Sequence, residues 1–389
     1  MGKMKIGIVT LWSTSDNYGG ILQTFALQRY LRDKGHDAFI IRYGHKHTLI
    51  QKLRTWLSSF IKELLIMFGV LDKRREVAFQ EWKKEKEWDL KRNFNVFRNT
   101  YIALSAEQYE TLNDIKHNPP EADIYITGSD QMWSKDVRDT FQQIKYLNFG
   151  DNNVRRVAYA VSFGHHVFPC VDVELFRRLL SRFEKISMRE ESGVSILKEM
   201  GIESVRCCDS TLLLHKDCYL SLMSRRKHID KYAYIYTVNV TTPDEIYWNE
   251  LKELIRNNNM KAVVTTASGY KKAEELLDNC IYDYASVEEW LANIYYSDIV
   301  ITASFHGIVF SLLFKKDFIY VPLKGKYGSG NDRIIELLDC VGLSGRMATA
   351  KSDLSFLFNN RINYDIIKDD NLLQLINFSR EFLELNKSN

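Results

Sequence analysis

A histidine that directly follows a buried strand is the residue of this sequence best placed for chemistry. His306 comes after the apolar run 298–302 and before the apolar helical run 307–314. In open α/β sheets, side chains at the carboxyl ends of strands face the crevice in which ligands bind. Imidazole titrates near neutral pH, so His306 is a candidate general acid or base. A purely structural histidine is the competing interpretation.

An arginine occupies a similar position earlier in the chain. Arg189 ends the strand pattern of residues 185–189 and precedes a helix that begins at Glu190. A guanidinium beside the N–H groups of a helix N-terminus suits a phosphate or a carboxylate. Because Glu190 and Glu191 follow directly, Arg189 is alternatively a structural ion-pair former.

Further strand ends carry glycine, polar and aromatic residues. Gly19 and Gly20 follow the first strand, where they serve either a tight turn or an anion site. Asp130 and Trp133 follow another strand. They either cap a helix and fill the core or contact a sugar, with the indole stacked on its face. The run 209–211 is first of all an N-cap signature.

Alternating strands and helices position these residues. Residues 5–12 form a short apolar strand, a loop and a helical pattern follow, and residues 38–43 return as a strand. This βαβ unit places its loop at the carboxyl edge of a parallel sheet. A second series of strands and helices begins near Tyr232. The fold class is therefore α/β with largely parallel sheets.

An internal repeat suggests that the two series are alike. Residues 123–129 and 298–304 match at five of seven positions. Matching strand ends are expected of two Rossmann-like domains that face each other across a cleft, the layout of glycosyltransferase-B-like folds.

The polar, basic stretch before Tyr232 marks the boundary between these domains. We predict an N-terminal domain over residues 1–222, on the acceptor side, with a helical insertion at about 46–118. We predict a C-terminal domain over residues 223–389, on the donor side. The last helix, residues 371–385, either stays with the second domain or crosses back to the first.

Composition and charge argue against several other classes of protein. The formal net charge is +3 over 389 residues, which gives no indication of nucleic-acid binding. The six cysteines show no C-x-x-C pair and no metal-ligand spacing with the nine histidines, so we expect reduced thiols and no metal site. No run reaches the roughly 18 apolar residues of a membrane-spanning helix, so we expect a cytoplasmic protein.

The segment 57–71 qualifies the expected location. It is apolar with two charges and has basic residues on both sides. Most amphipathic helices pack on their own domain, and this one would then cover the domain or close over the cleft. A basic-flanked amphipathic helix also lies on anionic membrane surfaces, so peripheral contact with the inner membrane surface stays open. The flanking basic residues are Lys52, Arg54, Lys73, Arg74 and Arg75.

Six short motifs occur in an order that is typical of one family. They are Asn17-Tyr18-Gly19-Gly20, Gly128-Ser129-Asp130-Gln131-x-Trp133, Ser162-Phe163-Gly164, Ser187-Met188-Arg189-Glu190-Glu191-Ser192-Gly193, Asp209-Ser210-Thr211-Leu212-Leu213 and Ser304-Phe305-His306-Gly307. In this series the chain resembles the polysaccharide pyruvyltransferase family, from residue 5 to about 345. The resemblance implies a glycosyltransferase-B-like fold, phosphoenolpyruvate as donor, and transfer of its pyruvyl group to a sugar as a cyclic ketal. It requires no metal and no cofactor beyond the donor substrate.

The resemblance also implies roles for individual residues. His306 and Arg189 are the predicted catalytic residues. The predicted donor-binding residues are Arg189, Ser304, Phe305, Gly307, Arg333 and Lys324. The predicted acceptor-binding residues are Asn17, Tyr18, Gly19, Gly20, Ser129, Asp130, Gln131, Trp133 and Ser162.

The sequence departs from the family pattern on the donor side. Much of the family has an arginine where this chain has Ser304, and relatives with this version of the motif often have an acid where it has Ala303. If phosphoenolpyruvate is the donor, another cation must hold it. The candidates are Arg333, Lys324 and Lys326, in or beside the glycine-rich loop 325–332, which we expect to face the donor.

Three functional classes stay open. The first is pyruvyl ketal transfer to a lipid-linked or nucleotide-linked saccharide during surface-polysaccharide assembly. The second is a glycosyltransferase that uses a nucleotide sugar in the same cleft. The third is a non-catalytic saccharide-binding relative, which the absence of the family's arginine at Ser304 suggests.

Overall fold

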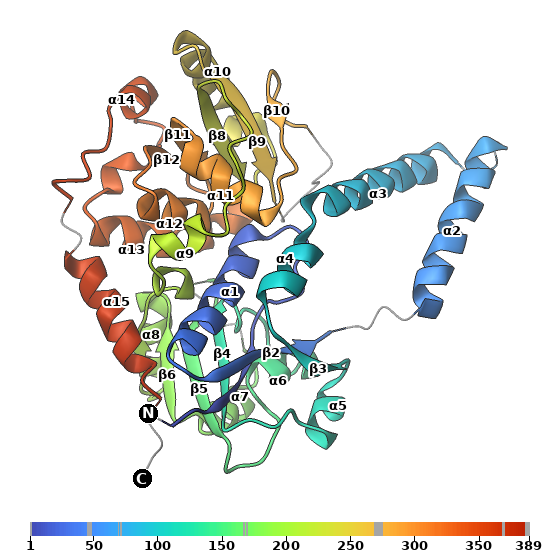
Figure 1. The fold of residues 1–389 in the computed structure, drawn as a ribbon, viewed down its shortest axis with the longest axis vertical. Coiled ribbons are helices and arrows are strands. Elements are labelled where there is room, and N and C mark those ends of the chain that lie inside the picture. Colours follow the sequence, from blue (N-terminus) through green and yellow to red (C-terminus); the bar gives the residue numbers. More distant parts are fainter. Residues whose placement is uncertain are drawn as a thin grey trace.

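The strands form two parallel sheets, one in each half of the chain (Figure 1). The computed structural model describes residues 2–44, 49–68, 70, 72–165, 168, 170–267, 275–367 and 370–385. Helices connect successive strands in both halves, which is the α/β arrangement predicted from the sequence.

The first sheet contains seven strands. They are β1 (Lys5–Val9), β2 (Asp37–Tyr43), β3 (Leu104–Tyr109), β4 (Ile124–Asp130), β5 (Arg155–Val161), β6 (Lys185–Met188) and β7 (Val205–Arg206). They lie side by side in the order β3-β2-β1-β4-β5-β6-β7 and pair in parallel. The central strands β4 and β5 are buried along nearly their whole length, as expected of parallel strands covered on both faces.

Helices and one 3₁₀ turn connect the strands of the first half. They are α1 (Tyr18–Asp33), α5 (Leu112–His117), α6 (Thr140–Lys145), α7 (Val173–Leu180), α8 (Glu191–Glu199), the 3₁₀ turn η1 (Ser210–Leu212) and α9 (Lys216–Leu220). Helix α1 begins where the polar loop after β1 ends. There the Asn17 side chain accepts a hydrogen bond of 2.8 Å from the backbone N–H of Gly20 and caps the helix.

The second sheet contains five strands. They are β8 (Tyr232–Thr237), β9 (Lys261–Thr266), β10 (Ile281–Tyr282), β11 (Ile299–Thr302) and β12 (Phe318–Tyr320), in the order β10-β9-β8-β11-β12. Its helices are α10 (Trp248–Asn257), α11 (Val287–Tyr296), α12 (Phe305–Leu313), α13 (Asp332–Cys340) and α14 (Leu354–Asn359). The 3₁₀ turns η2 (Pro243–Ile246), η3 (Gly325–Gly330) and η4 (Ser344–Arg346) lie between them.

Both sheets have the strand order of a Rossmann fold. The first strand of each half, β1 or β8, lies between its second strand and its fourth. The two repeated sequences are the fourth strands: β4 pairs with β1, and β11 pairs with β8. The fold class predicted from the sequence, two Rossmann-like domains in a glycosyltransferase-B-like arrangement, is confirmed. The crevice between first and fourth strands is where such sheets bind ligands.

An aromatic cluster joins the two halves. Tyr18 of α1 stacks on Trp290 of α11 with ring centres 5.4 Å apart, and its hydroxyl donates a hydrogen bond of 2.7 Å to the carbonyl oxygen of Ala285. Tyr236 and Phe310 of the second half pack edge-on against the same indole. One continuous hydrophobic core therefore runs from the first sheet into the second half.

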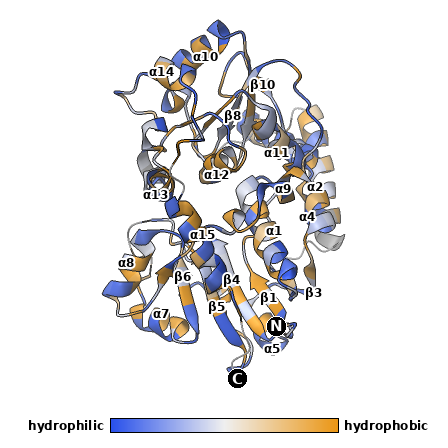
Figure 2. Cartoon of the chain, turned by 60° about the vertical axis from the view of Figure 1, so that its left-hand side comes forward, coloured by the Kyte–Doolittle hydropathy of each residue, from blue (hydrophilic) through white to orange (hydrophobic). Residues whose placement is uncertain are grey.

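The last helix, α15 (Asp370–Phe382), crosses back to the first half (Figure 2). The Ser379 hydroxyl accepts a hydrogen bond of 2.8 Å from the backbone N–H of Cys208, and Arg380 donates one of 2.9 Å to the carbonyl of Leu213. The N-terminal half is therefore built from two stretches of chain. The predicted boundary at 222/223 stays a prediction.

The predicted helical insertion at about 46–118 is wrong in part. Its helices are α2 (Leu49–Met67), α3 (Lys73–Arg92) and α4 (Phe94–Tyr101), but β3 lies in the same segment and pairs with β2 at the sheet edge. Of the described helices, none is long and apolar enough to cross a membrane. Helices α2 and α3 form an open hairpin that stands away from the body of the protein (Figure 1).

Replacing Trp290 tests the shared core. Trp290→Ala removes a fully buried indole from the contact between the halves, and we expect the free energy of unfolding to fall by about 3–5 kcal/mol. Urea unfolding measures this. Trp56→Ala, on the exposed helix α2, is the matched control, with an expected change within about 0.5 kcal/mol. Equal effects of the two substitutions would contradict a core that joins the halves.

Candidate functional site

The candidate site lies where α1 of the first half meets α12 of the second. Gly19 is in the first turn of α1, and His306 is in the first turn of α12, which follows strand β11. A Cβ atom added to Gly19 would lie only 1.9 Å from Nδ1 of His306, so the absence of a side chain makes room for the imidazole. The two motifs contact each other across the halves.

The other nitrogen of the imidazole faces a buried carboxylate. Nε2 of His306 lies 3.6 Å from Oδ1 of Asp209, and His306 is 6% exposed. This distance permits an ion pair but exceeds that of a normal hydrogen bond. Asp209 is held by its own turn, since its Oδ1 accepts hydrogen bonds from the hydroxyl and the backbone N–H of Thr211. The carboxylate thus has a fixed direction toward the histidine.

A buried guanidinium continues the cluster on the far side of Asp209. Nη1 of Arg189 lies 3.0 Å from Oδ1 of Asp130 and 3.1 Å from Oδ2 of Asp209. Its Nε lies 2.9 Å from Oε1 of Glu190. The face of the guanidinium lies over the ring of Phe305, 5.0 Å from its centre. Arg189 is therefore neutralised by three carboxylates of its own chain.

The charges of this cluster stabilise one another. Burial alone would raise the pKa of Asp209, but His306 and Arg189 favour its charged form and hold the pKa well below its usual value. Arg189 likewise outweighs burial at Asp130 and lowers the pKa of that carboxyl. For Arg189, burial is outweighed by its carboxylates, which raise the pKa above the usual range. All three groups are charged at neutral pH.

A small pocket opens beside the cluster. Arg333, at the start of α13, lines it, and its Nη1 lies 4.0 Å from Oδ1 of Asp130. Among the described residues, Nε of Arg333 has no hydrogen-bond partner. Burial and the nearby charge of Arg189 lower the pKa of Arg333. The lining residues are Gln131, Phe163, Gly164, His165, Glu190, Ser192, Gly193, Ser329, Gly330, Asp332 and Arg333.

Comparison with known families agrees with this arrangement of motifs. The family model described as polysaccharide pyruvyl transferase matches residues 17–324 of the chain. The protein belongs to the polysaccharide pyruvyl transferase family. The match includes both halves of the site, from Asn17, which caps α1, to His306 of α12. No curated protein matches the chain in sequence.

Solved structures of similar architecture share little sequence with this family member. The UDP-GlcNAc 2-epimerase of Methanocaldococcus jannaschii is 11% identical, with a TM-score of 0.48 over 99% of this chain and 94% of that one. The UDP-N-acetylglucosamine 2-epimerase of Rickettsia bellii is 10% identical, with a TM-score of 0.47 over 98% and 95%. The calicheamicin glycosyltransferase CalG4 is 11% identical, with a TM-score of 0.42 over 98% of each chain.

Two predicted acceptor residues belong to the core instead. Trp133 is fully buried and stacks on Tyr146 with ring centres 4.9 Å apart, so no face of its indole is open to a sugar. Tyr18 is fully buried in the contact between the halves. The sequence prediction of sugar contacts at these two residues is wrong, because both rings are buried against other side chains of the hydrophobic core.

Other predicted acceptor residues support the site from within. Ser129 is buried, and its hydroxyl lies 3.2 Å from Asp209. The buried hydroxyl of Ser162 accepts a hydrogen bond of 2.9 Å from the N–H of Gly164. Asn17 caps α1, with the N–H of Gly20 as its donor. Of the predicted acceptor residues, Gln131 lines the pocket.

Some of the predicted donor residues lie at the charged cluster, and others have a structural role. Phe305 and Arg333 lie at the cluster, with the Arg333 guanidinium 5.6 Å from the centre of the Phe305 ring. Ser304 caps α12 and accepts from the N–H of Gly307, and a Cβ at Gly307 would lie 2.5 Å from the Thr302 hydroxyl. These two residues are therefore structural in this conformation.

Of the other proposed compensating cations, Lys324 lies away from the pocket, whereas the glycine-rich loop beside it contributes to the lining. Lys324 is exposed, with its ammonium 4.7 Å from the centre of the Tyr247 ring, and it does not line this pocket. The side chain of Lys326 lies outside the described residues. The glycine-rich loop 325–332 contributes residues that include Ser329 and Gly330 to the pocket wall. The loop was expected to face the donor, and it lies beside the pocket proposed to hold it.

Asp209 is the functional residue that sequence reasoning missed. The run 209–211 was predicted as an N-cap, and Asp209 does cap η1. Its second carboxylate oxygen binds Arg189, while the first faces His306. The available signal was its position: Asp209 follows a strand at the same sheet edge as Arg189 and Asp130.

Removing the buried cation should destabilise the protein in a pH-dependent way. Arg189→Met leaves three carboxylates without it, and we expect the free energy of unfolding at pH 7 to fall by about 3–5 kcal/mol. In the wild type the pKa values of Asp130 and Asp209 are lowered. That stabilisation is present above the unfolded pKa of about 4 and lost as the pH falls below it. In the variant, buried and unpaired carboxyls take up protons more readily. The difference in free energy of unfolding between the wild type and the variant should therefore become smaller from neutral to acid pH.

Urea unfolding at a series of pH values tests this expectation. Arg155→Met is the matched control, because Arg155 pairs with Glu184 at the surface. Its expected effect at pH 7 is within about 1 kcal/mol. A gap between wild type and Arg189→Met that widens toward acid pH would contradict the charged cluster.

Proposed function

We propose that the protein transfers the pyruvyl group of phosphoenolpyruvate to a saccharide as a cyclic ketal in surface-polysaccharide biosynthesis. Membership of the polysaccharide pyruvyl transferase family supports this reaction class. The observation that carries the proposal is the approach of His306 to Asp209 and Gly19 at the meeting of the two halves. A pocket with an arginine in its wall lies beside the same cluster.

The proposed reaction balances without an added cofactor. A proton adds to the methylene carbon of phosphoenolpyruvate, and the neighbouring carbon becomes electrophilic. One sugar hydroxyl attacks that carbon and loses its proton, and the bond to the phosphate oxygen breaks. A second hydroxyl then attacks the same carbon and also loses its proton. The products are the ketal, with its new methyl group, and inorganic phosphate.

His306 is the proposed general acid and base for these proton transfers. The carboxylate of Asp209 lies 3.6 Å from Nε2 and gives the imidazole a defined orientation for proton transfer. Arg189 is already paired with carboxylates, so we assign it mainly to positioning Asp209 and Asp130. Its buried Nη2 has no hydrogen-bond partner among the described residues and is therefore available to a ligand.

Arg333 is the proposed cation for the anionic donor. It lines the pocket and lies 4.0 Å from Asp130, and its Nε has no hydrogen-bond partner in the part of the chain that the structure describes. Phosphoenolpyruvate carries a carboxylate and a phosphate, both of which a guanidinium binds well. This assignment replaces the family's arginine at Ser304, whose hydroxyl caps its own helix.

The proposed acceptor is a lipid-linked or nucleotide-linked saccharide, with Gln131 as a pocket residue that contacts it. Nucleic acid is not a proposed partner. A lipid-linked acceptor would bring the protein to the cytoplasmic face of the membrane. Peripheral contact with that surface is therefore part of the proposal.

Phosphate release from phosphoenolpyruvate, with a panel of lipid-linked saccharides, tests the reaction and the two main roles. We expect His306→Ala to lower kcat by about 10²–10⁴-fold, the usual contribution of general acid–base catalysis. Arg333→Met should raise KM for phosphoenolpyruvate more than it lowers kcat, because it removes a binding charge. The exposed His117 and Arg361 supply matched controls, His117→Ala and Arg361→Met, which should match the wild type.

Two other results of these experiments would favour the glycosyltransferase or the non-catalytic binding protein. Failure to bind phosphoenolpyruvate at millimolar concentration, with tight binding of a nucleotide sugar, would favour a glycosyltransferase. Saccharide binding that survives His306→Ala, with no turnover in the wild type, would favour a binding protein. Mass spectrometry of a product heavier by one pyruvyl ketal establishes the proposed transfer.

Gly19→Ala tests the contact between the halves. The added Cβ would lie 1.9 Å from Nδ1 of His306, so the imidazole must move. We expect kcat to fall by about a hundredfold, since small misplacements of a reacting group have effects of this size. Gly345→Ala, where an added Cβ meets no neighbour within 4 Å, is the control. Wild-type activity of Gly19→Ala would show that this position of His306 is not needed.

A further inference from the structure

Helix α2 exposes an unusual amount of hydrophobic surface. It spans nineteen residues, yet none of its described side chains is buried. Trp56 is 63% exposed, and Phe68, just beyond the end of the helix, is 71% exposed. Figure 1 shows α2 standing apart from both sheets. A contiguous apolar surface of this kind marks an interaction site.

The exposed apolar residues form one stripe. Leu53, Trp56, Phe60 and Met67 recur at intervals of three, four and seven residues, so they share a face of the helix. Trp56 and Phe60 stack, with ring centres 5.9 Å apart. Figure 2 shows hydrophobic colour along α2.

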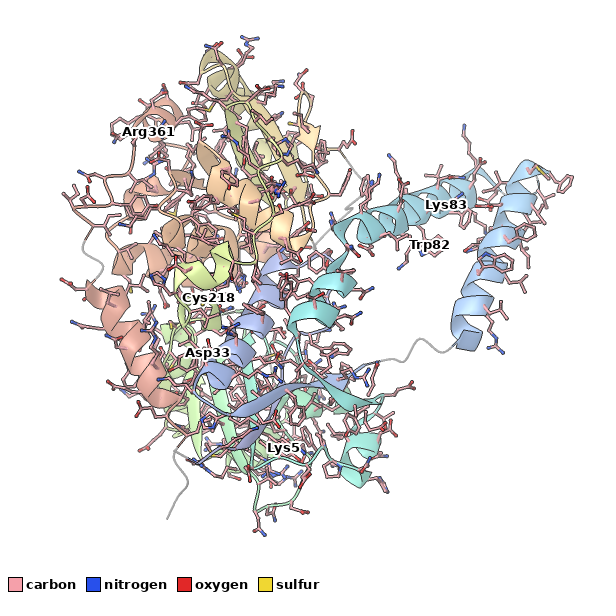
Figure 3. The ribbon with its side chains drawn as sticks, viewed as in Figure 1. Lys5, Asp33, Trp82, Lys83, Cys218 and Arg361 are labelled. Carbon is pink, nitrogen blue, oxygen red and sulfur yellow. The ribbon has the colours of Figure 1, made fainter. Side chains whose placement is uncertain are left out.

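Helix α3 faces a different side of α2. An open groove between the two helices is lined by Ile61 and Leu65 of α2 and by Phe79 and Trp82 of α3. Lys83 reaches across from α3, with Nζ 2.6 Å from Oε1 of Glu63. Figure 3 shows Trp82 and Lys83 on the side of α3 that faces α2. The hairpin is thus held together without using the stripe.

The tip of the hairpin combines apolar and basic residues. Met67, Phe68 and Val70 are all more than half exposed. Lys73, Arg74 and Arg75 come after Asp72, and all three are exposed. Residues 52–75 contain six basic and two acidic side chains. This surface therefore offers hydrophobic side chains beside a net positive charge.

We propose that the α2–α3 hairpin docks the protein on an anionic lipid surface, with the stripe in the interface between headgroups and acyl chains. Aromatic and aliphatic side chains flanked by cations are the features that bind such surfaces. The charges of Lys62 and Glu63 within α2 suit a helix that lies in the plane of the surface. A second copy of the chain complements the hairpin poorly, because symmetric pairing at the tip would bring Lys73, Arg74 and Arg75 against the same cations.

The inference deepens the proposed function, since it names the surface that would bring the protein to a lipid-linked acceptor, and it rests on that proposal for its biological setting. Vesicle binding itself requires neither phosphoenolpyruvate nor a saccharide. Failure of the docking proposal is therefore separable from failure of the transferase proposal, which is measured by phosphate release.

Co-sedimentation with vesicles tests the docking. The full-length protein is mixed with vesicles of phosphatidylcholine alone or of phosphatidylcholine with phosphatidylglycerol. We expect binding to the anionic vesicles that weakens with salt, and little binding to the neutral ones. Trp56→Ser/Phe60→Ser and Lys73→Glu/Arg74→Glu should each weaken it by about tenfold or more, from lost apolar burial and lost attraction respectively.

Matched variants separate this surface from general effects. Ile229→Ser/Ile366→Ser removes two exposed apolar side chains from the body of the protein, and Arg177→Glu/Arg178→Glu reverses an exposed basic pair on α7. Both should bind like the wild type. Trp56→Phe should keep binding but diminish the blue shift of tryptophan fluorescence on vesicles. Thermal melts check that every variant is folded.

Three results of the vesicle experiments would overturn the proposal. They are absence of binding to anionic vesicles, equal binding to both kinds of vesicle, and binding that survives both hairpin variants. Sedimentation velocity tests the alternative that a second copy of the chain, and not a lipid surface, binds the stripe. A wild-type dimer that Trp56→Ser/Phe60→Ser converts to a monomer would assign the hairpin to a second copy of the chain instead.

Discussion

The arrangement of the site depends on the neutralisation of one buried guanidinium. Arg189 is 4% exposed, and a charge so far from water is tolerated only with partners of opposite sign. The partners are Asp130 at the end of β4, Glu190 directly after Arg189, and Asp209, which caps η1. Because these partners are fixed, Asp209 is fixed, and its Oδ1, the oxygen that does not bind Arg189, gives His306 a neighbour of defined direction.

This constraint also explains how the site is divided between the halves. The histidine comes from α12 of the second half, while its carboxylate and the glycine beneath its ring come from the first. A small rotation of one half against the other would separate Nε2 from Oδ1 without unfolding either half. The stacked pair of Tyr18 and Trp290 lies at the same contact and resists such a rotation.

The sequence was informative where strands are apolar and buried on both faces. The repeat at 123–129 and 298–304 predicted equivalent strands, and both are the fourth strand of a Rossmann-ordered sheet. The sequence carried no indication of β3, an edge strand whose Leu104–Tyr109 mixes apolar and polar residues, includes the exposed Glu107 and lacks an apolar run. It also could not distinguish an indole in the core from one that faces a sugar, because Trp133 would follow a strand end in either case. The link between Asp209, Arg189 and His306 is long-range, and no local pattern contains it.

The return of α15 to the first half has a consequence for how the chain is made. The N-terminal half uses residues 370–382 as part of its surface, through Ser379 and Arg380. During synthesis from the N-terminus, the ribosome must therefore release nearly the entire chain before this half can close. Until the second half has been translated, the first sheet lacks helix α15, and the region around Cys208 stays exposed to solvent. A fragment that stops at the domain boundary would lack part of its own fold, and a chimaera that exchanges first halves between relatives would need to take the last helix with them.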